Sequence, residues 1–123
     1  MNQKKVLIID DEIDLCLLLK SYFLRRNYEV HLSHSLADGL KHIREQNPEV
    51  IFLDNNLPDG TGWTIAPEIA QDYPHTYINL ISAYHPPVPK MPAGSRFSIY
   101  EKPITLADLT QRFGTISYPN QGQ

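Results

Sequence analysis

Short apolar runs that each end in a polar residue constrain the fold of this chain more than any other feature. Val50, Ile51, Phe52 and Leu53 form an uninterrupted apolar run, and Asp54 follows at once. A run of branched and aromatic residues without polar alternation predicts a strand that is covered on both faces. Taken alone, Asp54 is more typical of a turn than of a nucleophile, because Asp bonds well to its own backbone in turns. The other runs decide between the two interpretations.

The same pattern recurs along the chain and alternates with helical patterns. We expect strands over residues 6–9, 28–32, 50–53, 77–81 and 97–101. Apolar residues at helical spacing predict helices over about residues 13–26, from Ser35 to before Pro48, from about Thr64, and from Thr105 to Gly114. Parallel strands need crossover connections, so strands that alternate with helices predict an α/β fold with a doubly wound parallel sheet and helices on both faces.

Proline limits two of the expected helices. Pro67 would cost roughly 3 kcal/mol inside a helix but little in its first turn, so we place the regular part from about Thr64, with a kink as the alternative. Between the fourth and fifth strands the chain reads AYHPPVPKMPAGSRFSIYE. A helix in so short a segment cannot recover the cost of its prolines, and we expect none there.

Length and charge exclude several classes of protein. The 123 residues fit one domain with a single core. The net charge is −3, from 11 basic and 14 acidic residues, and no Lys or Arg run provides the footprint of a nucleic-acid binder. We therefore expect no direct nucleic-acid partner. The only cysteine, Cys16, is predicted to be a buried thiol.

Targeting signals are also missing from the sequence. No apolar stretch approaches the roughly 20 residues that span a bilayer, and the N-terminus lacks a signal-peptide core. We expect a cytoplasmic protein without a membrane partner. There is no Gly-rich loop of the P-loop or dinucleotide-binding type. The five histidines show no ligand spacing, and we interpret them as surface residues: His31, His34, His42, His75 and His85.

Polar residues at the carboxyl ends of the expected strands define a candidate site. Ligands bind at this edge of an open α/β sheet. The first strand ends at Asp10 and Asp11, the third at Asp54, the fourth at Ser82 and the fifth at Lys102. Clustered carboxylates repel one another unless a cation lies among them, and oxygen ligands without His or Cys suit Mg²⁺.

Three carboxylates are more than Mg²⁺ usually takes from a protein. One or two carboxylates plus phosphate oxygens suffice, which leaves Asp54 free to act as a nucleophile. Phosphoryl transfer needs a metal, a cationic side chain and a hydroxyl or amide donor. Lys102 and Ser82 can supply the last two.

With these residues the chain resembles the receiver domain of a two-component response regulator over about residues 4–113. The motifs that carry the resemblance are the acidic pair in LIIDDE, the segment FLDNNLPDGTG, the dipeptide Ser82 and Ala83, and the EKP of residues 101–103. It implies a flavodoxin-like five-stranded sheet in the order 2-1-3-4-5, with the domain over residues 1–116 and a flexible tail over 117–123.

The resemblance also implies roles for the strand-end residues. Asp54 would accept a phosphoryl group from a sensor histidine kinase or a histidine phosphotransfer protein. Asp11, Asp54 and the backbone carbonyl of Asn56 would hold Mg²⁺, and Asp10 would hold a metal-bound water. The domain would be no turnover enzyme, although it can catalyse its own phosphotransfer and dephosphorylation, and it would act on a downstream protein or on an output domain outside this chain.

Two further implications concern the phosphoryl group and the end of the fifth strand. Ser82 would bond to the phosphoryl group, and Lys102 would pair with it. The bond between Lys102 and Pro103 would be cis, a form that proline tolerates.

The chain departs from the family pattern in two places. The fourth helix is replaced by the proline-rich segment. The family's mobile aromatic residue lies three positions before the lysine, where this chain has Ile99. Tyr100 is adjacent, and strand alternation turns it to the other face. Both departures fall on the surface that such domains use to signal.

Two alternatives remain open. A phosphatase with an aspartyl nucleophile would need a second acid two residues after Asp54, and that position is Asn56. A pseudo-receiver that signals without phosphate fits the lost helix, although the complete set of acids, Ser82 and Lys102 argues against it.

Overall fold

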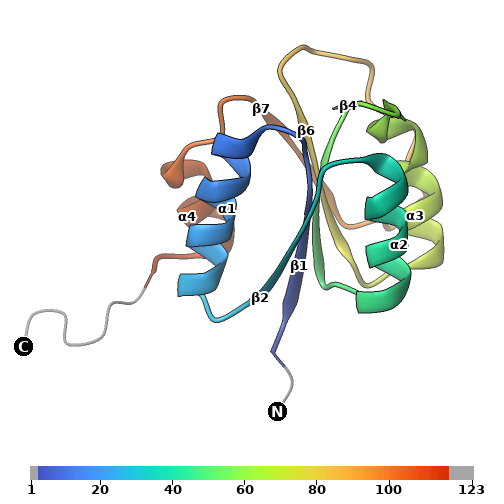
Figure 1. Cartoon of the computed structure of the whole chain (residues 1–123). Helices are drawn as coiled ribbons and strands as arrows, with labels where there is room; N and C mark the ends of the chain where they lie inside the picture. The colour runs from blue at the N-terminus through green and yellow to red at the C-terminus, as the bar shows by residue number, and fades with distance from the viewer. Residues whose placement is uncertain (1–2, 117–123) are drawn as a thin grey trace, which may run out of the picture.

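The computed structural model describes residues 3–116, so the expected tail over 117–123 lies outside the described residues. Its main sheet has five parallel strands, β1 (Lys5–Ile9), β2 (Glu29–Ser33), β3 (Val50–Asp54), β6 (Tyr77–Ser82) and β7 (Phe97–Glu101). They lie in the order β2-β1-β3-β6-β7 (Figure 1). The predicted flavodoxin-like sheet order is confirmed, because β6 and β7 are its fourth and fifth strands.

Helices cover both faces of the sheet. α1 (Ile13–Arg25) and α4 (Leu106–Phe113) lie on one side, and α2 (Leu36–Gln46) and α3 (Ala66–Asp72) on the other (Figure 1). One apolar cluster, which includes Phe23 and Phe52, fills the space under α1 and α4. The other includes Ile43 and Ile69 and lies under α2 and α3. Every residue of β3 is buried, as its apolar run predicted.

Local signals set the helix ends close to where the sequence places them. The Ser35 hydroxyl accepts a hydrogen bond from the Asp38 backbone N–H at 3.2 Å and begins α2. Thr105 and Asp108 form a reciprocal capping box at the start of α4. Pro67 lies in the first turn of α3, where its missing N–H costs little. The α-helix begins at Ala66, two residues later than predicted, because a 3₁₀ turn (η1, Gly62–Ile65) precedes it.

A small hairpin between β3 and η1 has no counterpart in the sequence prediction. β4 (Asn56–Leu57) pairs antiparallel with β5 (Gly60–Thr61). At its tip the Asp59 carboxylate accepts hydrogen bonds from the Leu36 and Ala37 backbone N–H groups, at 2.7 and 2.9 Å. The loop after Asp54 is thereby joined to the first turn of α2.

Residues 83–96 connect β6 to β7 without forming a helix. This confirms the predicted loss of the fourth helix, which the proline content explains. On β7, Ile99 is 47% exposed, whereas Tyr100 packs against the cluster that contains Phe52. The two side chains therefore face opposite ways, as strand alternation predicts.

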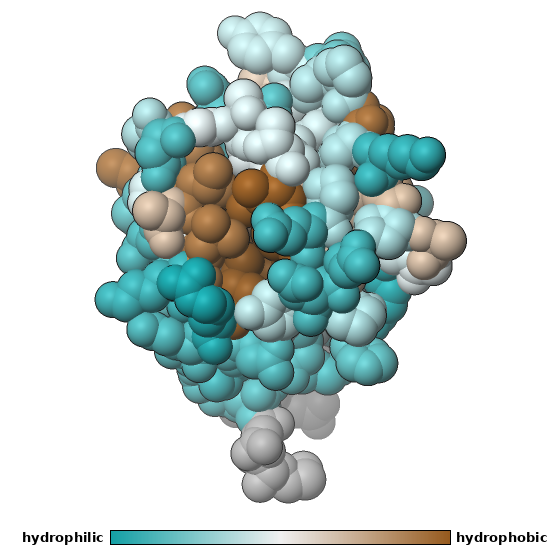
Figure 2. All heavy atoms as spheres, turned by 90° about the vertical axis from the view of Figure 1, so that its right-hand side faces the viewer, coloured by the Kyte–Doolittle hydropathy of each residue, from teal (hydrophilic) through white to brown (hydrophobic). Residues whose placement is uncertain are grey.

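Apolar side chains also reach the surface beside α2 and α3. Figure 2 looks onto this side of the molecule and shows apolar atoms gathered in one area among polar ones. Partly buried apolar residues that pack against the core on this side are Leu36, Leu40, Ile65, Tyr73, Met91 and Phe97. Among the helices of residues 3–116, none is long and apolar enough to cross a lipid bilayer.

Candidate functional site

Three aspartates meet at the carboxyl edge of the sheet. Asp10 follows β1 directly, Asp11 is next, and Asp54 is the last residue of β3. One carboxylate oxygen from each lies within 4.8 Å of the others. Asp10 and Asp54 are buried, and Asp11 is exposed. The parallel pairing of β1 with β3 produces this arrangement, because both strands end at the same edge.

Lys102 closes the cluster from the other side of β3. Its Nζ atom lies 3.0 Å from Asp10 Oδ2, 3.0 Å from Glu12 Oε1 and 3.3 Å from Asp54 Oδ1. The lysine follows β7, and its backbone N–H donates to the Ser82 carbonyl oxygen at 2.8 Å. The bond to Pro103 is cis, as the resemblance implies. One ammonium group thus balances part of the charge of three carboxylates.

The electrostatics of the cluster are those of crowded, buried acids. Burial, and then the negative charge of Asp10, raise the pKa of Asp54 from 3.8 to about 6, although Lys102 and the Asn56 backbone N–H act in the opposite direction. Burial also raises the pKa of Asp10 above its usual value. Burial alone would lower the pKa of Lys102, but the carboxylates outweigh it and raise that pKa. A divalent cation among these oxygens would relieve the repulsion.

The backbone around Asp54 is supported by two residues of η1. A Cβ atom on Gly62 would lie 2.1 Å from the Asp54 carbonyl oxygen, so only glycine allows this close approach. The Trp63 indole Nε1–H points at two carbonyl oxygens, 3.2 Å from that of Leu53 and 3.1 Å from that of Ile81. It bridges the ends of β3 and β6 next to Asp54, and its ring is buried.

Ser82 and Asn56 complete the residues that the sequence singled out. Ser82 is the last residue of β6, and its Oγ atom accepts a hydrogen bond from the Tyr84 backbone N–H at 3.1 Å. Asn56 lies in β4, two residues after Asp54. All the predicted site residues therefore lie on the carboxyl edge of the sheet or directly beside it.

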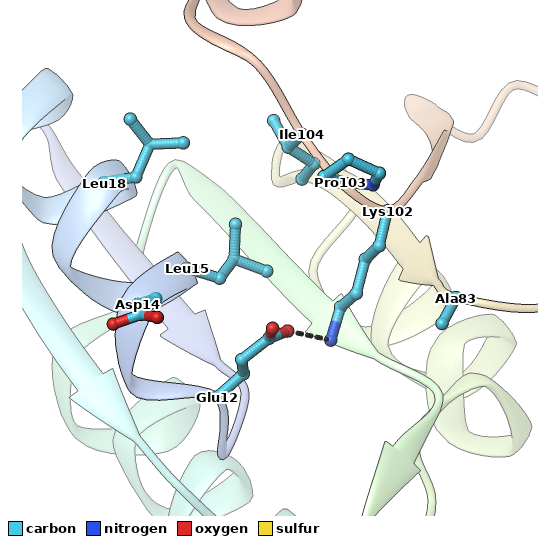
Figure 3. A pocket seen from close by; sticks show the side chains of 8 residues that line it. All are labelled: Glu12, Asp14, Leu15, Leu18, Ala83, Lys102, Pro103 and Ile104. Carbon is cyan, nitrogen blue, oxygen red and sulfur yellow. Dashed lines mark ion pairs between the residues drawn. The ribbon is translucent and has the colours of Figure 1, made fainter.

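An apolar pocket of about 460 Å³ opens beside the cluster, between α1 and the segment that follows β7 (Figure 3). Figure 3 shows Glu12 and Lys102 pointing toward each other at its edge, with the ion pair dashed. The remaining lining residues are Asp14, Leu15, Leu18, Ala83, Pro103 and Ile104. Lys102 thus lies between the acidic cluster and this pocket.

Comparison with known protein families agrees with this geometry. The model of the response regulator receiver domain matches residues 6–113, which is most of the chain. This chain belongs to the response regulator receiver domain family. It is a receiver domain of the two-component type, and receiver domains bind Mg²⁺ at an acidic pocket and interact with histidine kinases or phosphotransfer proteins.

Curated relatives of the domain are longer proteins. The response regulator protein PilR of Pseudomonas aeruginosa is 27% identical over 118 residues, which cover 94% of this chain and 26% of that protein. The uncharacterized transcriptional regulatory protein YclJ of Bacillus subtilis is 30% identical over 67 residues, or 54% of this chain and 30% of that protein. The chain thus spans less than a third of the length of these relatives.

Solved structures share the fold. A CheY-like receiver domain from Methanospirillum hungatei has a TM-score of 0.75 and 20% identity, and the match covers 90% of each chain. The response regulator TrrA from Thermotoga maritima, in complex with Mg²⁺–BeF, has a TM-score of 0.71 and 22% identity over 89% of this chain and 96% of that one.

Three residues of the site were missed from the sequence. Glu12 contacts Lys102, Gly62 permits the approach of η1 to β3, and Trp63 bridges two strand ends. The LIIDDE motif could have indicated Glu12, since it is a third acid at the end of the first strand and can pair with a cationic side chain there. No local pattern distinguishes the other two, because their roles depend on contacts across η1, β3 and β6.

Proposed function

We propose that this receiver domain accepts a phosphoryl group on Asp54 in a Mg²⁺-dependent reaction and thereby changes its affinity for a protein partner. The observation that carries the proposal is the convergence of a buried Asp54 with Asp10, Asp11 and Lys102. Burial keeps water away from the nucleophile, and the neighbouring charges can neutralise the incoming phosphoryl oxygens.

The donor is a phosphohistidine of a sensor histidine kinase or a phosphotransfer protein. A carboxylate oxygen of Asp54 forms a bond to phosphorus as the phosphorus–nitrogen bond breaks. The electron pair of that bond stays on the imidazole, which takes up a proton from solvent. Because the chain offers the acceptor and positions the charges, it takes part in its own phosphotransfer, and in hydrolysis of the acyl phosphate, without turning over a separate substrate.

Lys102 and Ser82 act on the transferred group. Lys102 Nζ lies 3.3 Å from Asp54 Oδ1. Once Asp54 carries the phosphoryl group, this ammonium can pair with one of the phosphoryl oxygens instead. The Ser82 hydroxyl already accepts a hydrogen bond from the Tyr84 N–H, so its own hydrogen remains available to a phosphoryl oxygen. The same hydroxyl would then join the site to the segment over residues 83–96.

The donor set fits Mg²⁺. It offers carboxylate oxygens without sulfur or imidazole nitrogen, and the raised pKa values of Asp10 and Asp54 reflect a burial and repulsion that a cation would offset. Asp11, Asp54 and the backbone carbonyl of Asn56 would hold the ion, with Asp10 on a bound water. When bound, Mg²⁺ would neutralise charge that develops on the phosphoryl oxygens.

The experiment is phosphoryl incorporation from acetyl phosphate with Mg²⁺, measured by intact mass. Wild-type chain should gain one phosphoryl group, and Asp54→Asn should gain none, because Asp54 is the only proposed acceptor. Asp59→Asn is a matched control, since Asp59 lies five residues away in the same loop. Labelling that persists in Asp54→Asn would exclude this assignment. A wild-type chain that is never labelled would favour the phosphate-independent pseudo-receiver.

The partner side of the proposal follows from the family and from the length of the relatives. A kinase or phosphotransfer protein supplies the phosphoryl group, and a downstream protein or an output domain outside this chain reads the result. The net charge of −3 favours a protein over nucleic acid as the direct partner. With these partners we propose a cytoplasmic location.

A further inference from the structure

Two histidines that are distant in the sequence meet on the face of the sheet opposite α1. His31 lies in β2 and His42 in α2, and their ring centroids are 6.0 Å apart. β2 is an edge strand of the sheet, and α2 packs against it. Both rings are partly shielded, with side-chain exposures of 22% and 25%.

The His31 ring has a defined hydrogen-bond partner. Its Nε2 atom lies 2.5 Å from Glu29 Oε2, in the same strand and on the same face. A carboxylate can only accept, so the proton of the neutral ring resides on Nε2. The other nitrogen, Nδ1, then carries a lone pair. This contact also lowers the pKa of Glu29, which keeps the carboxylate charged.

The His42 ring is oriented in the opposite sense. Its Nδ1 atom lies 3.1 Å from the Asp38 carbonyl oxygen, 3.4 Å from Asp38 Oδ2 and 2.7 Å from Ser33 Oγ. Two of these three oxygens can only accept a hydrogen bond, so we assign the proton of the neutral ring to Nδ1, and the Ser33 hydroxyl then acts as an acceptor. The lone pair is therefore on Nε2.

These contacts are those of metal-binding histidines. A histidine that binds a metal through one nitrogen almost always donates its other N–H to a carboxylate or a backbone carbonyl, which sets the tautomer and raises the basicity of the ligating nitrogen. His31 and His42 each show this pattern. In the described part of the chain, neither His31 Nδ1 nor His42 Nε2 has a hydrogen-bond partner.

The separation of the rings suits one shared ion. Two imidazoles on one tetrahedral zinc have centroids about 5 Å apart, given Zn–N bonds of about 2.0–2.1 Å. The observed separation is 6.0 Å, so a shared ion would draw the two rings closer together. Glu29 and Asp38 add negative charge beside the rings, and the ammonium of Lys5 partly offsets the charge of Glu29.

We propose that His31 Nδ1 and His42 Nε2 form a two-histidine site for a borderline transition-metal ion such as Zn²⁺ or Cu²⁺, with water in the remaining positions. Imidazole ligands favour these ions over Mg²⁺. Neither histidine belongs to the cluster of Asp10, Asp11, Asp54 and Lys102. The proposed metal site can therefore be tested independently of the proposed phosphorylation of Asp54.

Calorimetric titration of the full chain with Zn²⁺ tests the proposal, in millimolar Mg²⁺ so that the acidic cluster is already occupied. The informative variants remove a ligand and keep the hydrogen bond. In His31→Gln the amide nitrogen replaces Nε2 toward Glu29, and in His42→Asn it replaces Nδ1 toward Asp38. His75→Gln is the control on another part of the surface.

We expect one Zn²⁺ per wild-type chain and a loss of affinity of at least about tenfold in each ligand variant, with the control unchanged. Histidine ring resonances in NMR spectra should shift for His31 and His42 on addition of Zn²⁺ and stay in place for His75 and His85. Wild-type affinity retained in both ligand variants, shifts confined to other histidines, or no binding to the wild-type chain would each overturn the proposal.

Discussion

The carboxyl edge of the sheet and the segment over residues 83–96 are neighbours with opposite physical character. At the edge, buried carboxylates, Lys102 and the Trp63 N–H connect the ends of four strands, β1, β3, β6 and β7. The segment carries four prolines and an exposed Tyr84. Its side-chain bonds include those of Ser82 with the Tyr84 N–H, His85 with Glu101, Ser95 with the Pro92 carbonyl oxygen, and Arg96 with the His75 carbonyl oxygen.

This contrast separates two tasks. The chemistry of phosphoryl transfer needs side chains held in place in a water-poor site, and the edge provides this. A change of conformation needs an element with few stabilising contacts, and residues 83–96 are such an element. In this receiver domain the segment lies where the family has its fourth helix, so the part that we propose as the responding element differs more from the family than the proposed phosphorylation site does.

Replacement of Gly62 gives the largest expected effect. A Cβ 2.1 Å from the Asp54 carbonyl oxygen forces η1 away from β3, and we expect Gly62→Ala to lower the free energy of unfolding by about 3 kcal/mol or more. Urea denaturation measures the loss. Gly94→Ala in the loop is the matched control. No atom lies near that Cβ, so only its positive φ of 81° costs stability, about 1 kcal/mol.

Equal destabilisation by the two glycine variants would contradict the distinction between a closely packed edge and an open loop. If Gly62→Ala is too unstable to purify while Gly94→Ala folds, that result would support the distinction.

Mg²⁺ gives the next largest effect. Binding to the native state alone stabilises it by about 2.7 kcal/mol at one hundred times Kd. Thermal melting with and without millimolar Mg²⁺ should show this increase for the wild-type chain. Asp11→Ala should abolish the shift, because it removes one of the three carboxylates. Superimposable wild-type curves would count against a metal site at this edge.

The pH dependence of Asp54 is a smaller effect with a definite sign. Its folded-state pKa of about 6 lies above the ordinary value of 3.8, so the folded chain binds this proton more tightly than the unfolded chain. Stability from this group is present at low pH and is lost as pH rises from about 4 through 6. A shift of about two pKa units sets an upper bound of roughly 3 kcal/mol, and we expect on the order of 1–2 kcal/mol.

The comparison of wild type with Asp54→Asn isolates this group, since the other titrating residues are common to both. Without metal, Asp54→Asn should be the more stable protein at pH 7, and the difference should vanish near pH 4. Urea denaturation at several pH values provides the measurement. A difference that stays constant with pH would show that Asp54 has an ordinary pKa.

Amide exchange in the loop gives the smallest expected effect. The Ser82 hydroxyl can accept from the Tyr84 N–H and donate to a phosphoryl group at once, so occupancy of the site should hold the loop more firmly. We expect beryllofluoride with Mg²⁺ to slow exchange by less than about tenfold, or about 1.4 kcal/mol. The reporting amides are Tyr84, Val88, Lys90, Met91 and Ala93 to Phe97.

Exchange that is slow and unchanged in both states would contradict the loop as the switching element. Slowing that is confined to the strand ends, with the loop unaffected, would contradict the role of Ser82 as the link between the two regions.

The sequence alone predicts the five strands of the main sheet, the four α-helices and the list of candidate site residues, but neither the β4–β5 hairpin nor η1. Apolar runs predict the central strands β1, β3 and β6 because burial on both faces requires continuous apolar side chains, whereas the edge strands β2 and β7 are less buried. Ser35, Thr105 and Pro67 indicate helix starts because a capping hydrogen bond, and the missing N–H of a proline in the first turn, both act within one turn of the helix. The prolines of residues 83–96 exclude a helix for an equally local reason, the missing N–H and the ring clash. Strand ends then supplied Asp10, Asp11, Asp54, Ser82 and Lys102.

Only the tertiary structure decided which side chains meet. Glu12 reaches Lys102 across 90 residues of sequence, and the Trp63 N–H reaches two strand ends, because the parallel register of β1, β3, β6 and β7 brings them together. His31 and His42 show no ligand spacing along the chain, yet the packing of α2 on β2 places their rings side by side. Local sequence patterns indicate whether a residue is buried and which nearby backbone groups it can bond to. Contacts between elements depend on sheet order and register, which are set only when the whole chain packs.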